Sequence, residues 1–570
     1  MPQDAFHIRR CAKELNTFLV GGKINRISQV NKDELTFIIY TGKSTVKLII
    51  STNASNARVC LSTTEKEPLA VAPNFCMLLR KHLQNAEILE IRQHEFERII
   101  EIDLHCTTDF SQASRTLVCE LMGKYSNVVL VEKGIVLGAL KTTSLVDDTH
   151  RILFAGAKYV YPAPQDKVSP FDSDGIKERL KSFLENRENG VESEDLAQFV
   201  FQSVSGLALP TARELVLHAQ QKNGSLAMCF SPSATAPIWD FIGDFCLNEP
   251  SNPHIRVDKV GITDFFAFEI AGGVKMPSLC KAEDEFYTKR EMKKGFDDKK
   301  RRLESGVRTL VKKTGKRLQE TKEKLREAEK SEENRIKGEL LTANLYAIEK
   351  GMRFAEVINW YDNGNTLKIP LDPLLSPAKN AQKYFKAYNK QKRAKEILLP
   401  MQKADEDELA YAESIASALS LAETDVDLAE IETELTDAGL LHTKKQTLKK
   451  NKKETPVPFR EYEHNGKKIL VGRNNLQNER LLKVASPDDI WLHVQKYHSS
   501  HVIILVDGGQ VCDETILYAA KLCAFYSQAQ GSDKIPVDYC KRKFVKKPKG
   551  SKAGFVTYTD YKTVLVDGRL

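Results

Sequence analysis

The chain has 570 residues, of which 41% are hydrophobic, and its 85 Lys and Arg against 77 Asp and Glu give a formal net charge of +8. This length predicts three or four domains at roughly 150 residues each, with enough apolar residues for packed cores. The sequence contains no apolar run of about 18 residues and no N-terminal secretion signal, so we expect neither a membrane protein nor a conventionally secreted one. Eleven cysteines without a C-x-x-C pair argue against a disulfide framework and a zinc ribbon. A reducing cytoplasm is the expected setting.

Residues 1–170 are predicted to form one domain of helices and antiparallel sheet, closed by the linker Tyr161–Pro164. Its predicted elements are a helix at 6–19, a hairpin of alternating apolar residues at 35–39 and 46–50, a short helix after Asn74, and strands at 98–104, 116–121 and 127–131.

Glu97 and Arg98 stand together at the entrance of one predicted strand. Arg98 could grip a phosphate or a base edge while Glu97 accepts from a base amino group or steadies the guanidinium. A plain surface ion pair explains the same two residues. The sequence leaves both interpretations open.

Residues 175–275 are predicted to form a helix-hairpin-helix module. A helix from Glu194 to about Ser203 meets the turn 205–210, and a second helix begins at Thr211. The amides of such a hairpin can hold a nucleic-acid backbone without sequence preference, although many hairpins of this kind are only structural.

Residues 280–450 are expected to form a long antiparallel coiled-coil arm. Phe296, Leu303 and Leu310 are spaced by seven residues, and the pattern resumes out of phase at Leu318 and Leu325. Behind Thr424, Leu428, Ile431 and Leu435 mark a second helix. We predict a first arm helix at 280–350, a tip at 351–400 and a second arm helix at 401–450. At ~1.5 Å per residue the rising helix would reach on the order of 100 Å.

Three basic clusters stand out, at 299–302, 444–453 and 541–552. Concentrated positive charge attracts phosphate backbones without reading sequence. For the arm cluster at 299–302 a solvated helix face is an equally good explanation, whereas the Pro-Lys-Gly turn within 541–552 favours nucleic acid.

The C-terminal domain, at 455–570, carries polar and aromatic residues at predicted strand ends. Side chains of these types can stack on bases and bond to phosphates or 2′-hydroxyls. The candidate RNA-binding residues are Gly472, Arg473, Asn474, Asn475, Trp491, His493, Lys546 and Lys547. His493 and His501 could instead ligate a metal ion, but no third ligand stands at a suitable spacing, so we expect no metal and no cofactor.

The segments GRNNLQN, DIWLHV, SHVIIL and VKKPKGSKAGF, together with LVGGKINRISQVNKDEL and ELMGKYSNVVL nearer the N-terminus, closely resemble the NFACT family. This family includes the bacterial RqcH-type ribosome quality control factors, also described as fibronectin-binding protein A-like. Three positions depart from the family pattern: Gln3-Asp4-Ala5 replaces Phe-Asp-Gly, Glu97 replaces Asp, and His498-Ser499 replaces Pro-Gly.

The resemblance implies a multidomain α+β protein that binds a large ribosomal subunit still carrying peptidyl-tRNA. Such a protein recruits charged tRNA, expected to be alanyl-tRNA, and supports template-free C-terminal tailing of the stalled chain. The ribosome would perform peptidyl transfer, so no catalytic residue is expected. Ribosomal RNA and a small RNA-binding quality-control protein are further expected partners. The resemblance also implies that Glu97, Arg98, Glu120 and Met122 handle tRNA.

Two other functions were weighed. In a DNA glycosylase/lyase, Pro2 could form a Schiff base once Met1 is removed, but Gln3 stands where the catalytic Glu is expected. A surface adhesin that binds fibronectin would need an unconventional route of export, and we expect any such role to be secondary.

Overall fold

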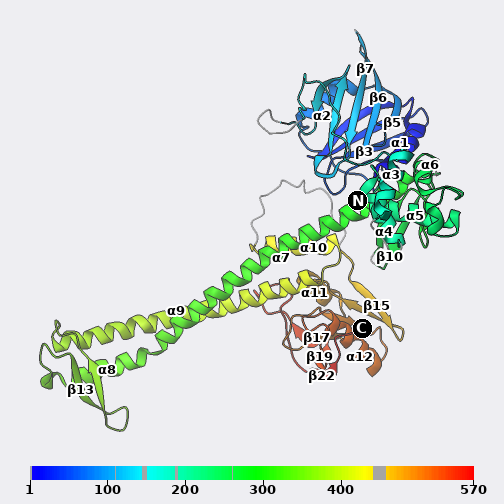
Figure 1. The fold of residues 1–570 in the computed structure, drawn as a ribbon. Coiled ribbons are helices and arrows are strands. Elements are labelled where there is room, and N and C mark those ends of the chain that lie inside the picture. Colours follow the sequence, from blue (N-terminus) through cyan, green and yellow to red (C-terminus); the bar gives the residue numbers. More distant parts are fainter. Residues whose placement is uncertain are drawn as a thin grey trace. The chain divides into compact units, whose positions relative to one another are not determined.

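The computed structural model describes residues 3–108, 111–143, 151–185, 191–248, 250–259, 261–440 and 457–570. The chain divides into two compact units, Met1–Lys293 and Lys294–Leu570 (Figure 1). The predicted multidomain α+β architecture is confirmed. No helix within the described ranges is both long and apolar enough to cross a membrane.

An antiparallel sheet forms the first half of unit 1. Its strands follow the order β4-β3-β2-β1-β5-β6-β7-β8-β9 among the described residues. The bounds are β1 (Lys23–Asn31), β2 (Glu34–Tyr40), β3 (Thr45–Ser51), β4 (Arg58–Leu61), β5 (Glu87–Gln93), β6 (Ile99–Thr108), β7 (Ser111–Glu120), β8 (Asn127–Glu132) and β9 (Ile135–Ala139). The predicted hairpin is β2–β3, in which Phe37 pairs with Leu48.

Helices α1 (Ala5–Leu19) and α2 (Asn74–Leu83) bury their apolar faces against this sheet. Asp4 caps α1, because its carboxylate accepts from the backbone amide of His7 at 3.0 Å. Predicted apolar positions of α1, including Ile8 and Leu15, are fully buried. The 3.6-residue period therefore identified both helices correctly.

The second half of unit 1 is mostly helical. It comprises α3 (Ser173–Glu185), α4 (Ser193–Ser203), α5 (Leu209–Asn223), the 3-10 helix η2 (Ala227–Phe230), α6 (Ile238–Asn248) and the small sheet of β10 (His254–Asp258), β11 (Gly261–Phe266) and β12 (Val274–Lys275). The first part of α7 (Leu279–Glu329), up to Lys293, packs into the same unit.

The α4–α5 hairpin turns toward the sheet domain rather than toward solvent. Its Ser205 amide donates to the Val168 carbonyl at 2.8 Å, and its Ala208 amide donates to Asp4 Oδ2 at 2.9 Å. Gly206, at φ +78°, packs so closely on Phe96 and Ala5 that a Cβ would meet both within 2.8 Å. Protein acceptors occupy these two amides, which favours the structural interpretation of the hairpin over contact with a nucleic-acid backbone.

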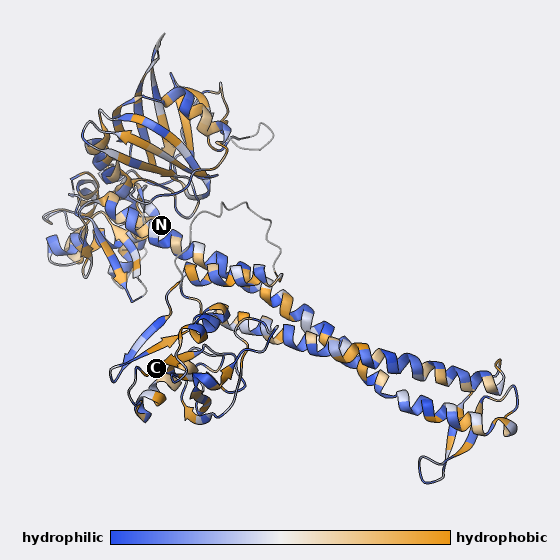
Figure 2. Cartoon of the chain, turned by 180° about the vertical axis from the view of Figure 1, so that it is seen from behind, coloured by the Kyte–Doolittle hydropathy of each residue, from blue (hydrophilic) through white to orange (hydrophobic). Residues whose placement is uncertain are grey.

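The arm of unit 2 is an antiparallel pair of long helices. The rest of α7, followed by α8 (Ser331–Ala343), packs against α9 (Pro377–Ser420). Leu303, Leu318 and Leu325 lie in the seam as predicted, whereas Leu310 is only half-buried and Val307 takes the inner position instead. The seam also buries Thr314 and Thr321. Hydrophilic residues cover most of both helices (Figure 2).

The returning helix of the arm begins at Pro377, inside the range 351–400 that the sequence suggested for the tip. Ser376 caps α9, and Pro377 occupies the first turn, where its missing amide costs nothing. The hairpin of β13 (Phe354–Asn359) and β14 (Asn365–Pro370) lies between α8 and α9. The predicted second helix, with Leu428, Ile431 and Leu435, is the shorter α10 (Asp425–Asp437), which packs on both long helices of the arm.

The C-terminal domain is a twisted antiparallel sheet with helices on both faces. Its strand order within 457–570 is β15-β16-β18-β17-β19-β22. The bounds are β15 (Arg460–His464), β16 (Lys467–Val471), α11 (Asn475–Val484), β17 (Ile490–Val494), β18 (Val502–Ile504), α12 (Asp513–Phe525), β19 (Ile535–Lys541), the 3-10 helix η4 (Arg542–Phe544), β20 (Val545–Lys546), β21 (Thr557–Tyr558) and β22 (Lys562–Val566). One apolar core lies under α12 and the other under α11.

Candidate nucleic-acid interface

The candidate tRNA-binding residues of unit 1 meet at one end of two neighbouring strands. Ile99, which opens β6, pairs with Glu120, which closes β7. The Leu121 amide donates to the Arg98 carbonyl at 2.8 Å. Antiparallel pairing thus brings Glu97 and Arg98 beside Glu120 and Met122, although more than twenty positions of sequence separate the two pairs.

Glu97 and Arg98 are both half-buried. Burial raises the pKa of the Glu97 carboxyl, and the positive charge of Arg98 partly opposes that rise. The guanidinium of Arg98 forms no hydrogen bond with any residue that the structure describes, so its donors stay available to a ligand. An arginine in this state suits a phosphate or a base edge.

The environment of Glu120 differs from that of Arg98, because its carboxylate is buried and accepts hydrogen bonds from other side chains. Arg151 Nη1 donates to it at 2.8 Å, and the Tyr159 hydroxyl donates at 2.8 Å. Met122 packs at the edge of the apolar cluster that contains Leu153. Glu120 therefore supports the strand end from within, whereas Met122 is half-buried at the same end.

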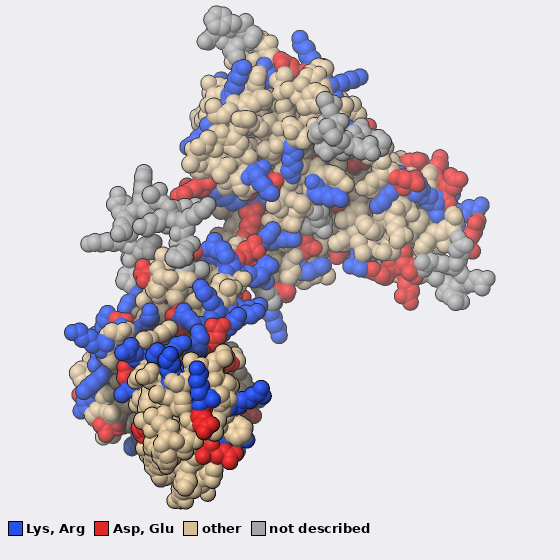
Figure 3. Space-filling view, turned by 90° about the vertical axis from the view of Figure 1, so that its left-hand side faces the viewer, with Lys and Arg blue, Asp and Glu red and all other residues tan. Residues whose placement is uncertain are grey.

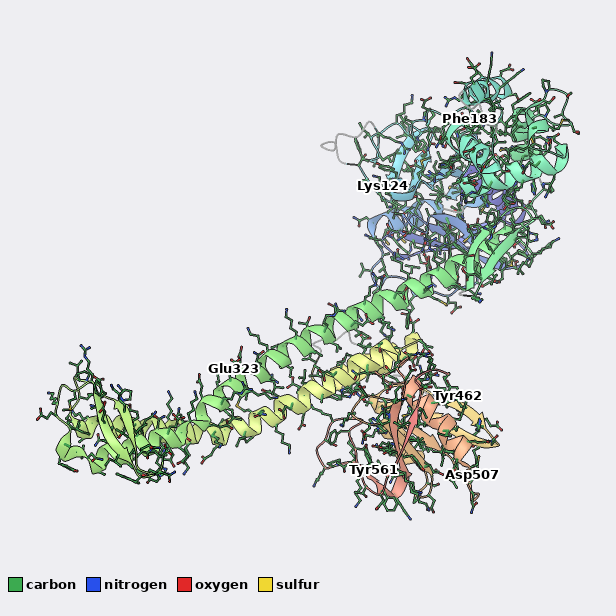
Figure 4. All side chains as sticks on the ribbon, turned by 60° about the horizontal axis from the view of Figure 1, so that its bottom comes forward. Lys124, Phe183, Glu323, Tyr462, Asp507 and Tyr561 are labelled. Carbon is green, nitrogen blue, oxygen red and sulfur yellow. The ribbon has the colours of Figure 1, made fainter. Side chains whose placement is uncertain are left out.

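The sequence analysis missed two residues of the turn that follows, the 3-10 helix η1 (Gly123–Tyr125). Lys124 is exposed (Figure 4), and its Nζ lies 4.8 Å from the ring centroid of Tyr125, which is 71% exposed. A cation beside an exposed aromatic ring suits phosphate contact and base stacking. The signal was available in the Gly-Lys-Tyr-Ser sequence of residues 123–126, between the two predicted strands at 116–121 and 127–131.

In unit 2, the polar segment 472–475 contacts the arm rather than solvent. Arg473 Nη1 lies 3.3 Å from Asp427 Oδ1, and the Asn474 amide donates to Glu430 Oε2 at 2.7 Å. The Asn475 amide donates to Glu434 Oε1 at 2.9 Å. α10 thus already binds part of the polar groups of these three side chains, and their contact with RNA stays a prediction.

The side chain of Asn478 leaves no room for a Cβ at position 472, so this position requires glycine. A Cβ at this position would lie 2.2 Å from Asn478 Oδ1, which accepts a hydrogen bond from the His501 amide at 3.0 Å. The Gly472 amide in turn donates to the His501 carbonyl at 3.0 Å. The glycine therefore acts through close packing, not through contact with a ligand.

Trp491 is fully buried, so its ring cannot stack on a base in this conformation. It lies parallel to His493 at a centroid distance of 5.6 Å and edge-on to His501 at 5.3 Å. Burial lowers the pKa of His493 to about 4 and that of His501 well below its usual value. Both imidazoles are consequently neutral at pH 7, and each can offer one donor and one acceptor.

The basic clusters differ in how far carboxylates neutralise them. At the base of the arm, Lys299 and Arg302 both contact Glu432, at 3.1 and 2.8 Å. Lys546 is exposed on β20, whereas Lys547 pairs with Glu479 at 2.6 Å. Figure 3 shows Lys and Arg gathered densely on unit 2 in this view. The cluster at 444–453 lies outside the described residues.

The residues of the alternative lyase site are described only in part. Gln3 is buried, and Pro2 lies outside the described residues. Within the parts of the chain that the structure describes, no group of three or more His, Cys, Asp or Glu could hold a metal ion.

Comparisons with known proteins agree with this architecture. Residues 4–454 match the family model of the NFACT N-terminal and middle domains, and residues 457–558 match that of the NFACT protein RNA binding domain. A protein named Rqc2 homolog RqcH from Bacillus subtilis is 33% identical over 565 residues, which cover 97% of this chain and 95% of that protein. Its namesake from Streptococcus suis is 32% identical over 579 residues and covers 99% of this chain and 98% of its own length.

Among solved structures, the N-terminal part of the fibronectin/fibrinogen-binding protein from Streptococcus suis is 26% identical. It covers 50% of this chain and 99% of its own, with a TM-score of 0.41. The two family models together span nearly the whole chain, and the RqcH proteins align with it from end to end. The chain therefore belongs to the NFACT family, as an RqcH-type ribosome quality control factor with an RNA-binding domain.

Proposed function

We propose that the protein binds large ribosomal subunits that carry a stalled peptidyl-tRNA, recruits charged tRNA, and supports template-free tailing of the nascent chain, with alanine as the expected added residue. The observation that carries the proposal is the end-to-end relationship to RqcH across both family domains. The ribosome would perform peptidyl transfer, so the protein would act by positioning RNA.

The proposed tRNA contact of unit 1 is centred on Arg98. Its guanidinium has no hydrogen-bonding partner among the described residues, and the exposed Lys124 and Tyr125 lie just beyond the adjoining end of β7. Together these residues would offer two cations and one aromatic ring to an RNA backbone. Glu97 would orient Arg98 by its negative charge, which already acts on the guanidinium.

The test compares two double variants of the full-length protein. Glu97→Ala/Arg98→Ala should abolish tail synthesis on purified stalled subunits while co-sedimentation with those subunits stays near the wild-type level. The matched control is Glu194→Ala/Arg213→Ala, which removes an exposed ion pair of the same residue types, 2.6 Å apart, from α4 and α5.

The control variant should tail normally. Normal tailing by the Glu97→Ala/Arg98→Ala variant would remove this pair from the mechanism. Failure of the wild-type protein to co-sediment with stalled subunits would overturn the proposed function as a whole.

A further inference from the structure

A large cavity with a mixed polar and apolar lining lies in unit 2 where the arm meets the C-terminal domain. Its volume is about 920 Å³, within the range of roughly 300–1,000 Å³ that is typical of small-molecule sites. One wall is the part of α9 from Lys403 to Ala418 with Leu421 just beyond the helix, the second is formed by the start of α11 and the histidines of 493–501, and the third is the loop 548–556. Helices α9 and α11 contact each other beside it (Figure 1).

The inner wall of the cavity carries a buried polar group without a partner. His501 is 1% exposed and lines the cavity, and its Nδ1 has no hydrogen-bonding partner among the described residues. Its backbone is held on both sides, by Gly472 and by Asn478, so the ring has a fixed position. A buried nitrogen of this kind is normally satisfied by protein, water or a ligand.

The outer wall of the cavity carries two lysines, and the α9 wall adds Lys403 and the carboxylates of Asp407 and Glu408. Lys549 and Lys552 line it from the loop, and neither forms an ion pair with any described residue. Lys552 Nζ lies 5.6 Å from the ring centroid of Tyr411, whose ring also lines the cavity. Tyr558 and Phe555 add further aromatic surface. Cations at the mouth and neutral rings inside match a ligand with an anionic end and a flat, hydrogen-bonding end.

A nucleotide has these two ends. We propose that the cavity receives one unstacked nucleotide of an RNA strand, with the base against His493 and His501 and the phosphate against Lys549 and Lys552. The proposal rests on the proposed function in one respect, namely that RNA is the partner of the C-terminal domain. It places the RNA contact in a cavity that Arg473, Asn474 and Asn475 also line, with part of their polar groups bonded to α10.

A cavity explains specificity that an open basic surface cannot provide. Neutral imidazoles bond to base edges, whereas phosphates are attracted by the lysines regardless of sequence. Duplex RNA would be excluded, because its bases are stacked and paired and cannot turn individually into the cavity.

The experiment measures binding to the ribosome-free, full-length protein by saturation-transfer NMR. The probes are the four nucleoside 5′-monophosphates, inorganic phosphate, a short single-stranded RNA and the matching duplex. We expect the monophosphates to bind, the single strand to displace them, and neither the duplex nor inorganic phosphate to do so at equal concentration.

Two variants block the site in different ways. Ala410→Trp fills the cavity from an exposed position of α9 and should abolish nucleotide binding, whereas Ala416→Trp, exposed on the same helix but outside the cavity, should not. Lys549→Glu/Lys552→Glu should weaken nucleotide binding by about tenfold or more, as expected when two phosphate contacts of roughly 1 kcal/mol each are lost. Its charge-matched control, Lys521→Glu/Lys562→Glu, changes exposed lysines elsewhere in the domain and should bind normally.

Several results would overturn the nucleotide site: no binding by the wild-type protein, equal binding by the two tryptophan variants, or equal competition by phosphate or duplex. Because the measurement contains no ribosomes, it fails independently of subunit binding. A wild-type protein that binds no nucleotide but co-sediments normally with stalled subunits would reject the cavity alone, and one that binds nucleotide but does not co-sediment would reject the proposed function alone.

Discussion

Asn475 donates its side-chain amide to the buried carboxylate of Glu434 at 2.9 Å, and the same amide group reaches Ser414 Oγ at 2.9 Å. One residue of the C-terminal domain thereby bonds to both α10 and α9. Together with the contacts of Arg473 and Asn474, this bond holds the domain on the arm.

Asn475→Ala should destabilise this junction. The substitution leaves Glu434 buried without its donor, and an unsatisfied buried polar group costs about 1–3 kcal/mol. Thermal unfolding, followed by hydrogen exchange in α10 and α11, measures the effect. Asn389→Ala on the exposed face of α9 is the control and should be neutral or slightly stabilising. Equal stability of the two variants would show that the bond contributes nothing.

Glu434 should make the junction less stable as pH rises. Burial raises the pKa of this carboxyl to about 7 from an ordinary value of 4.5. The folded state therefore holds the proton more tightly than the unfolded state does, and this contribution to stability is present below about pH 4.5 and is lost as pH rises through 7. Glu434→Gln keeps an acceptor for Asn475 and removes the titration.

The comparison of Glu434→Gln with the wild-type protein isolates that effect. At pH 8 the variant should be more stable by about 1–3 kcal/mol, and at pH 5 the difference should largely vanish. The pKa values of His493 and His501 are lowered, so their protonation destabilises the folded state as pH falls below 6.5. This effect is the same in both proteins and cancels in the comparison. A stability difference that does not change with pH would contradict the raised pKa.

Alanine substitutions at two leucines of the arm should destabilise the protein to different extents, although the seven-residue spacing treats the two positions alike. Leu303 is 2% exposed and Leu310 is half-buried. Leu303→Ala should cost about 2–5 kcal/mol, and Leu310→Ala clearly less, because a cavity forms only at a buried position. Chemical denaturation followed by circular dichroism at the helical signal measures both. Equal costs would place Leu310 in the seam.

Gly472→Ala should be destabilising, since its Cβ would lie 2.2 Å from Asn478 Oδ1 and force that side chain away from the His501 amide. The expected cost is about 1–3 kcal/mol. Gly315→Ala in α7 adds the same methyl group where nothing lies within 4 Å, and should stabilise the helix by about 0.5–1 kcal/mol. The melting temperature should therefore fall for Gly472→Ala and rise for Gly315→Ala. A Gly472→Ala variant as stable as the wild-type protein would contradict the close packing of Gly472 on Asn478.

The sequence predicted the parts of the fold that depend on local periodicity. Apolar residues such as Ile8 and Leu15 share a face every 3.6 residues, and the alternation at 35–39 marks a strand, because one face of each element is buried. The seam was harder to predict. Thr314 and Thr321 occupy inner positions, and no apolar pattern marks a buried threonine that bonds to a carboxylate of α9, such as Asp405.

The candidate site shows the same limit. The sequence left Arg98 open between a ligand contact and a surface ion pair, and nothing local distinguishes it from Arg473, whose partner Asp427 lies 46 positions away on α10. Polar residues at strand ends look alike in sequence whether they meet RNA or another part of the chain. Only the tertiary contacts separate the two cases.

The junction between α10 and residues 473–475 has a consequence for how the protein responds to proteolysis. Its bonds cross from α9 and α10 to α11 without using the intervening chain between Leu440 and Val457. A protease that cut only within that interval would therefore leave both fragments associated at neutral pH and low salt. The nicked protein would elute as one species on a sizing column and separate into two only under denaturing conditions.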